Sequence, residues 1–218
     1  MQRQLEIIRN AALPLLEGFI QMTVPLTLVS FMLGMAIAIV AALARNSKSR
    51  ILRGIFFFYV WVFRGTPLLV QLFIIFFGLP RAGIQFSPFS AAVLAFSLNT
   101  GAYASEAIRA ALMAIPIGQQ ESAASLGMGQ GQILRRIIAP QAFKIALPPL
   151  SNSFISLLKD TSLAASITIV ELFMAAQRIA ATTYEPLLLY SMVAIYYLVA
   201  TTLLTLLQGR MERRMNRY

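Results

Sequence analysis

The sequence contains no cysteine and no histidine, and only 12% of its 218 residues are charged. Without cysteine the chain forms no disulfide, thiolate metal site or thiol nucleophile. Without histidine it lacks the commonest general base and transition-metal ligand. The eight acidic residues are scattered, with no Glu-x-x-His or paired-carboxylate spacing. These absences argue against a membrane-embedded enzyme and against a metal site.

The chain is instead rich in apolar residues, which make up 58% of the sequence. A soluble domain carries about 25% charged residues, roughly twice the share found here. Too little polar surface is left to keep such a chain in water, so we predict an integral membrane protein. A net charge of +10 also occurs in nucleic-acid-binding proteins, but here the basic residues flank apolar runs, which is the pattern of membrane topology.

The apolar runs predict an all-α protein with about five transmembrane helices in a single domain, residues 1–218. A span needs about 20 apolar residues. The first uncharged run has 27 residues, too long for a signal peptide, whose apolar region has about 7–15. The predicted spans are residues 18–44, 54–80, 82–108, 141–160 and 186–209.

The distribution of lysine and arginine predicts the orientation of these spans. With five spans, twelve basic residues fall on one side of the membrane and five on the other, and Arg64 lies within a span. Because cytoplasmic loops carry the excess of Lys and Arg, we expect the N-terminus outside and the C-terminus in the cytoplasm.

Residues 116–140, between the third and fourth predicted spans, are patterned as two short helices. Pro116 interrupts the chain, small residues cover the run that follows, and Gly127 stands where a left-handed helix cap is wanted. Two interpretations fit this pattern alone: a knob that docks into a groove of another protein, or an amphipathic hairpin lying on lipid headgroups.

The residues of this segment resemble the cytoplasmic loop signature of ATP-binding-cassette (ABC) importer permeases. That signature is Glu-Ala-Ala, three residues, Gly, nine residues, then Ile-x-Leu-Pro. Two positions depart from it, since Ser122 replaces the first Ala and Ala139 replaces the Leu. The matching positions, which the resemblance implies couple the chain to an ATPase, are Glu121, Ser122, Ala123, Gly127, Ile137 and Pro140.

Further motifs resemble the polar-amino-acid subfamily of these permeases along nearly the whole chain. They are Arg-Gly-Thr-Pro-Leu-Leu from Arg64, Ser-Leu-Asn-Thr-Gly-Ala-Tyr from Ser97, and Lys-Asp-Thr-Ser-Leu from Lys159. The run from Ala146 to Leu157 is similar to the cystine permeases of that subfamily.

The resemblance implies a non-catalytic permease subunit of an ATP-driven, binding-protein-dependent importer in a bacterial plasma (inner) membrane. Its partners would be a second permease subunit, two ABC ATPases and an extracytoplasmic substrate-binding protein. The substrate would be a polar amino acid, with cystine favoured and basic amino acids or glutamine next. ATP and magnesium would be held by the ATPase, in agreement with the absence of a Gly-x-x-x-x-Gly-Lys phosphate loop here.

Polar side chains within spans are costly and are therefore candidates for function. On a helix, Asn99, Tyr103 and Glu106 share one face, as do Asn152, Ser156 and Asp160. We expect these two stripes to line the pore, although interhelical hydrogen bonds would also account for the first, and Glu106 has Arg109 three residues on. The predicted substrate-binding residues are Thr66, Asn99, Tyr103, Glu106, Asn152, Ser156, Asp160 and Thr161. Arg64 and Lys159 are predicted to act in a gate or in structural pairing.

An ion-coupled secondary carrier is the alternative within transport. Such carriers usually show internal repeats with broken helices at matching positions. Five spans do not divide into equal halves, and no repeat is found in the sequence. A scaffold protein would not need the polar stripes. The permease of an ABC importer is therefore the favoured function.

Overall fold

A computed structural model describes residues 2–215, and within this range the chain is helical with no strand. Its first element is a continuous rod of 44 residues, made of α1 (Gln2–Gly18), a π-helical turn (Phe19–Thr23) and α2 (Val24–Arg45). At 1.5 Å per residue the rod is about 66 Å long, roughly twice the hydrocarbon thickness of a bilayer.

Helices α3 (Arg50–Gly65) and α4 (Leu68–Phe73) are separated by a sharp break. Proline lacks a backbone N–H, and it disfavours helical geometry in the residue before it. Thr66, which precedes Pro67, accordingly has extended dihedral angles. The segment Leu68–Ala82, which continues through a π-helical turn and a 3-10 turn, is bent by 109° from α3.

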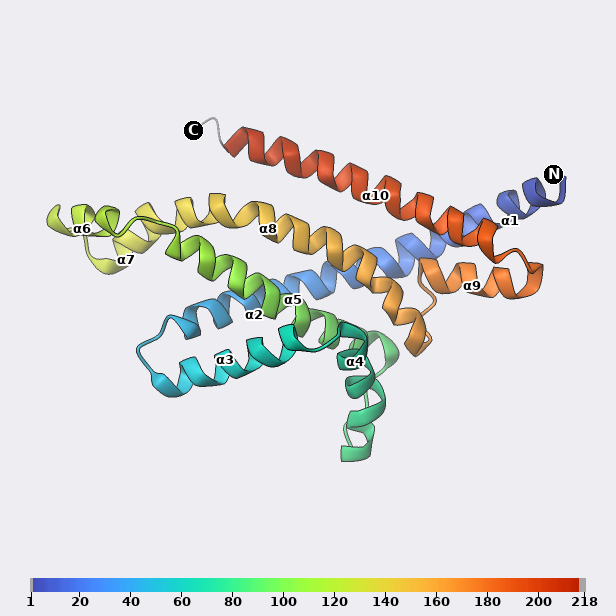
Figure 1. The fold of residues 1–218 in the computed structure, drawn as a ribbon, viewed down its shortest axis with the longest axis horizontal. Coiled ribbons are helices and arrows are strands. Elements are labelled where there is room, and N and C mark those ends of the chain that lie inside the picture. The colour runs from blue at the N-terminus through green and yellow to red at the C-terminus, as the bar shows by residue number, and fades with distance from the viewer. Residues whose placement is uncertain (1, 216–218) are drawn as a thin grey trace.

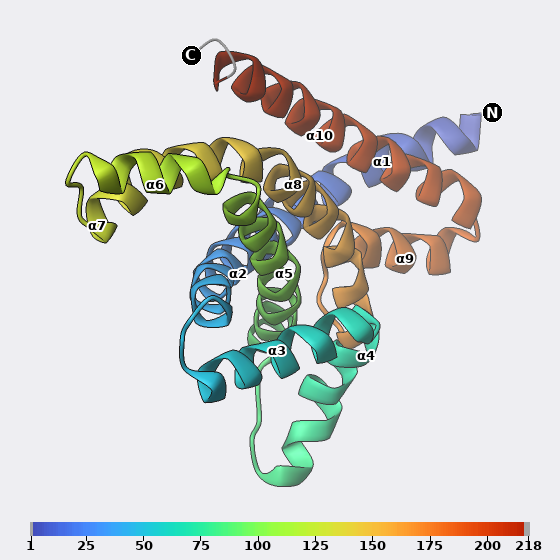
Figure 2. The same cartoon turned by 60° about the vertical axis from the view of Figure 1, so that its left-hand side comes forward.

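Helix α5 (Pro88–Met113) runs through the middle of the bundle, packed between α2 and α8 (Ala139–Asp160) (Figure 2). Small residues let α2 and α5 approach closely. A Cβ atom on Gly34 would lie 3.0 Å from Thr100 Cβ, and one on Gly101 would lie 2.8 Å from Ile37 Cγ2. The cluster formed by α2, α4, α5 and α8 is the largest part of the core.

The segment between α5 and α8 forms a helical hairpin at one end of the bundle (Figure 1). It contains α6 (Ile117–Ser125), α7 (Gln130–Ile133) and a π-helical turn (Leu134–Ile138). Gly127 follows α6 with φ of +78°, the left-handed conformation that glycine adopts without cost. Pro140 lies in the first turn of α8, where proline is tolerated, and α8 continues through Pro148 and Pro149.

A 3-10 segment (Thr161–Ile167) leads from α8 to α9 (Leu172–Thr183), and α10 (Pro186–Met215) ends the described chain. The N-terminal end of α1 and α9 lie at the end of the bundle opposite to α6 and α7 (Figure 1). There α1, α9 and α10 share a second hydrophobic cluster.

Two helical stretches in the described range are long and apolar enough to cross a membrane, Gln2–Arg45 and Pro186–Met215. The bent pairs Arg50–Ala82 and Gln130–Thr183 raise the count to four if each is one span. The predicted third span, residues 82–108, falls largely in α5. The number of spans therefore stays a prediction.

Candidate functional site

A cavity of about 440 Å³ opens between the α3–α4 break, α5 and α8, and is called here the first cavity. Three elements that are distant in sequence meet around it. Its lining residues are Thr66, Pro67, Leu68, Asn99, Thr100, Tyr103, Asn152, Ser153, Ser156, Leu157 and Asp160. Six of the eight predicted substrate-binding residues are thus brought together.

The α8 wall of the first cavity carries its only formal charge. Asn152, Ser156 and Asp160 follow one another at intervals of four residues and so share one helix face. Lysine and arginine are absent from the lining, so the carboxylate of Asp160 faces amide, hydroxyl and apolar groups. This arrangement suits a ligand that carries a positive charge and several hydrogen-bonding groups.

The side chain of Gln71 closes the break between α3 and α4. Its Nε2 lies 2.8 Å from the carbonyl oxygen of Phe63 and 3.0 Å from that of Thr66. Both carbonyls are at the end of α3, where helical partners are missing. The Oε1 of Gln71 accepts a hydrogen bond of 3.0 Å from Nδ2 of Asn99. Buried at 6% exposure, Gln71 therefore joins the break to α5.

Thr66 and Asn99 each use some of their hydrogen-bonding groups within the protein, at the contact between the α3–α4 break and α5. The Thr66 hydroxyl donates to the carbonyl oxygen of Val62 at 2.9 Å. The amide nitrogen of Asn99 donates to Gln71, which leaves its Oδ1 as the atom with acceptor capacity for a ligand. Asn99 thereby serves both the fold and the wall of the first cavity.

Gln71 is not among the site residues predicted from the sequence. The one available signal is that its amide side chain stands alone in an apolar run, which is costly within a membrane unless the amide is hydrogen-bonded. The partners lie eight residues earlier and on another helix, so they are visible only in the fold.

Glu106 lies outside the first cavity, at the centre of three arginines. It forms ion pairs with Arg45, with Arg109 at 3.0 Å and with Arg64 at 3.7 Å. The alternative prediction that Glu106 pairs with Arg109 is thus confirmed. This cluster borders a second cavity of about 390 Å³, lined by Arg45, Phe57, Val60, Trp61, Arg64, Gly65, Tyr103 and Glu106.

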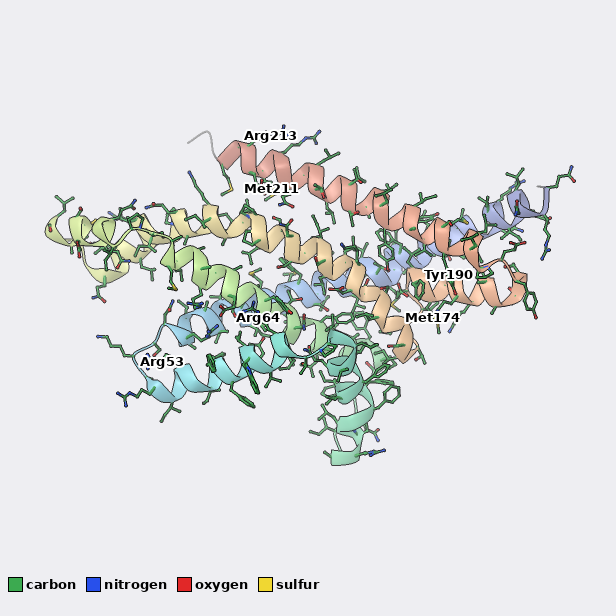
Figure 3. All side chains as sticks on the ribbon, viewed as in Figure 1. Arg53, Arg64, Met174, Tyr190, Met211 and Arg213 are labelled. Atoms are coloured by element: carbon green, nitrogen blue, oxygen red, sulfur yellow. The ribbon has the colours of Figure 1, made fainter. Side chains whose placement is uncertain are left out.

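Tyr103 belongs to the walls of both cavities. Its ring centroid lies 5.3 Å from the guanidinium carbon of Arg64, within the range of a cation–π interaction. Arg64 stands near the end of α3, close to α5, whereas Arg53 stands near the start of the same helix (Figure 3). Tyr103 therefore stands between a cavity whose one charged residue is Asp160 and a cavity that holds Arg45, Arg64 and Glu106.

Two further predicted residues do not line either cavity. Thr161 is fully buried, and its hydroxyl donates to the carbonyl oxygen of Leu158 at 2.7 Å. Lys159 is exposed on α8. Thr161 therefore supports the end of α8, and Lys159 is not among the residues that line the first cavity.

Glu171 is a second polar residue that sequence analysis missed as a site. It is fully buried and caps α9, accepting from the backbone N–H groups of Phe173 at 2.9 Å and Met174 at 2.8 Å. The Tyr197 hydroxyl lies 3.3 Å from the same carboxylate. These contacts join the start of α9 to α10, and Figure 3 labels a residue of each helix in this region, Met174 and Tyr190.

The predicted coupling residues lie on and beside α6. Glu121 and Ser122 are exposed, whereas Ala123 is buried against the core shared with α5 and α8. Leu126 ends the helix with 83% of its surface exposed. Gln120, Glu121 and Ala124 border a cleft of about 600 Å³ that α6 shares with α7. Ile137 is half-buried and Pro140 exposed on the segment that leads into α8.

Nothing in residues 2–215 gathers three or more histidine, cysteine, aspartate or glutamate side chains in a way that would hold a metal ion.

The sequence matches the family model described as binding-protein-dependent transport system inner membrane component over residues 30–217. The L-cystine transport system permease protein TcyB of Bacillus subtilis is 50% identical over 214 residues, covering 98% of this chain and 92% of the relative. The glutamine transport system permease protein GlnP of Escherichia coli is 36% identical, covering 94% of each chain.

Solved structures also match the fold of this chain. The crystal structure of an amino acid ABC transporter with histidines has a TM-score of 0.91 and 36% identity, covering 96% of this chain and 97% of the matched chain. An inward-facing structure of the MetNI methionine ABC transporter has a TM-score of 0.74 at 19% identity, covering 92% and 96%, and supports the fold alone.

Proposed function

This chain belongs to the family of binding-protein-dependent transport system inner membrane components, and from that membership we propose that it is the permease subunit of an ATP-driven importer of a polar amino acid. Cystine is the favoured substrate, because the cystine permease is half identical over nearly the full length. Basic amino acids and glutamine come next.

The observation that carries this proposal is the charge of the first cavity. A free amino acid bears an ammonium group, and Asp160 is the one charged residue in the lining. In the proposed complex the ammonium group lies against Asp160. Asn152, Ser156 and Oδ1 of Asn99 supply neutral hydrogen-bonding groups around it. Asp160 is half-buried, and a partly buried carboxylate attracts a cation more strongly than one in bulk solvent.

The position of α6 between α5 and α8 supports the following mechanism. Two ABC ATPases dock on α6 of two permease subunits, at the cytoplasmic end of the bundle. ATP and Mg²⁺ bind to those ATPases, whose movement is passed through α6 to the helices that wall the cavity. The substrate-binding protein delivers the amino acid at the opposite end, near α9. The subunit itself is non-catalytic and lies in a bacterial plasma membrane.

The test is uptake into proteoliposomes that contain this chain, its partner ATPase and its binding protein. Labelled cystine, arginine, glutamine and histidine are compared with and without ATP. ATP-dependent uptake of cystine is expected. ATP-dependent uptake of a different amino acid would support the proposed mechanism but reject cystine as the substrate. An assembled complex that takes up none of them would contradict the proposal.

The ion-coupled carrier is tested in the same vesicles. Such a carrier accumulates substrate under an ion gradient without ATP, whereas the importer stops when ATP is withheld. Uptake driven by a sodium or proton gradient in vesicles that lack the ATPase would favour the carrier.

A further inference from the structure

The cluster around Glu106 holds more positive than negative charge. Arg45, Arg64 and Arg109 contribute three guanidinium groups to a single carboxylate. The side chains of Arg45 and Glu106 are only 14% and 19% exposed, and buried charges are costly unless they are paired. Two unit charges remain unbalanced within the cluster. An anion entering the second cavity would therefore be stabilised.

Arg64 is the arginine that is free to bind such an anion. Its 3.7 Å separation from Glu106 is beyond hydrogen-bonding range, whereas Arg109 lies 3.0 Å from the same carboxylate. The side chain of Arg64 is 44% exposed, against 14% for Arg45 and 30% for Arg109. The planar guanidinium group matches the two oxygens of a carboxylate.

The two cavities have complementary charges and share one wall. The first carries the carboxylate of Asp160 and no cation, and the second carries the arginines. Tyr103 lines both, and the guanidinium group of Arg64 lies over its ring. An amino acid carries an ammonium group and a carboxylate, but the first cavity provides a charged partner only for the ammonium group.

We propose that the second cavity is a separate binding station for the carboxylate group of the transported amino acid, with Arg64 as the residue that binds it. This inference rests on the proposed function. The substrate passes Tyr103 between the two stations, and Arg64 exchanges its loose contact with Glu106 for the substrate. Ligands without a carboxylate have no station there.

The chain carries its own reporter for this step, because its single tryptophan, Trp61, lines the second cavity. Tryptophan fluorescence is measured on the detergent-purified complex with the ATPase during titration with L-cystine. A complex with Trp61→Phe supplies the background from the ATPase. The second ligand is cystamine, which retains the amino groups and the disulfide of cystine but has no carboxylate.

A saturable change in Trp61 fluorescence is expected with L-cystine and not with cystamine. Arg64→Gln is expected to raise the apparent dissociation constant for L-cystine by about tenfold or more, because a charge-assisted pair is lost. Arg64→Lys, which keeps the charge, should restore part of the affinity. Arg53→Gln removes an exposed arginine of the same helix outside both cavities and should leave the titration unchanged.

Equal responses to L-cystine and cystamine would overturn the inference, and so would an Arg64→Gln titration identical to that of the wild-type complex. The comparison of L-cystine with cystamine in the wild-type complex tests the inference even if the Arg64→Gln complex fails to assemble. Failure of the proposed function is read separately, from uptake. If arginine or glutamine is transported in place of cystine, that amino acid and its decarboxylated amine are titrated instead. Absence of a response to every amino acid tested also rejects the station.

Discussion

Asp160 is the residue on which substrate affinity is expected to depend most. Asp160→Asn keeps the size of the side chain and removes the charge from the first cavity. A hydrogen bond to a charged group contributes about 1.5–3 kcal/mol, so the KM for uptake should rise roughly 10- to 100-fold. The KM is measured in the reconstituted complex. Glu6→Gln, which removes an exposed carboxylate from α1, is the matched control. An unchanged KM in Asp160→Asn would remove Asp160 from the site.

Gly101 tests the packing behind the cavities. In Gly101→Ala the new Cβ would lie 2.8 Å from Ile37 Cγ2 and 2.9 Å from the hydroxyl oxygen of Tyr59. Such overpacking costs about 1–3 kcal/mol, and the thermal unfolding midpoint of the purified complex should fall. Gly54→Ala meets no atom within 4 Å in α3 and should keep or raise the midpoint. Equal midpoints for both variants would show that α2 and α5 are less tightly packed than described.

Individual residues differ in how far their surroundings follow from the sequence. The four-residue spacing of Asn152, Ser156 and Asp160 places them on one face of any helix, and the structure has that face in the first cavity. Glu106 does not line the first cavity with Asn99, because it pairs with Arg45 of α2 and Arg64 of α3. No local sequence pattern predicts that these two helices bring their arginines to Glu106. Thr161 likewise turns inward because the chain leaves the α-helix there.

At the scale of elements, the α3–α4 break depends on the single side chain of Gln71. Gln71→Leu would leave the carbonyl oxygens of Phe63 and Thr66 and the amide of Asn99 without this partner. The carbonyl oxygen of Phe63 would keep only its 3.3 Å hydrogen bond from Asn99, and a buried group left unsatisfied costs about 1–3 kcal/mol. The unfolding midpoint should drop and substrate affinity should weaken, since Thr66 and Asn99 line the first cavity. Gln85→Leu, at an exposed position, is the control. Wild-type affinity in Gln71→Leu would contradict a link between the break and the cavity.

The docking role of α6 is tested at its exposed end. Leu126→Asp replaces an apolar side chain with 83% exposure. A central interface residue contributes about 2 kcal/mol or more, so binding of the ATPase should weaken by about thirtyfold. Co-purification with a tagged ATPase measures this loss. Tyr184→Asp, 85% exposed after α9 at the opposite end, should co-purify normally. Retention of the ATPase by Leu126→Asp would place the docking surface elsewhere.

The elements themselves were predictable to different degrees. The extent of the apolar runs anticipates α2 and α10, and Gly127 anticipates the turn after α6. Pro140 lies in the first turn of α8, where proline is tolerated, and the helix continues past it. The 109° bend after α3 was not expected from the sequence, because Pro67 marks a break without setting its angle.

For the whole molecule, the distribution of charge predicts that the two ends of the bundle face opposite sides of the membrane. Because the sequence has no cysteine, single-cysteine variants give an unambiguous label. In intact cells an impermeant maleimide should modify Gln4→Cys in α1, whereas Gln130→Cys in α7 should react only after permeabilisation. The reverse pattern would invert the proposed orientation.

The family of the chain can be predicted from motifs spread along the sequence, and the family match over residues 30–217 agrees with that prediction. The two cavities do not follow from any motif. They arise where α5 meets α3, α4 and α8, which are joined to it only by tertiary contacts. The class of membrane protein can therefore be predicted from composition. The positions of the two cavities can be found only from the packing of the helices.

The position of α6 between α5 and α8 has a mechanical consequence. Tyr103 lies ten residues before the end of α5, about 15 Å along a rigid helix, and Asn152 lies thirteen residues into α8, about 20 Å from its start. The first cavity and the proposed docking helix α6 therefore lie at opposite ends of α5 and α8, and Pro148 and Pro149 stand in the part of α8 between them. Because a proline inside a helix removes a hydrogen bond, we expect a tilt imposed at α6 to reach the cavity through α5 as a rigid segment, whereas α8 can bend at its proline pair.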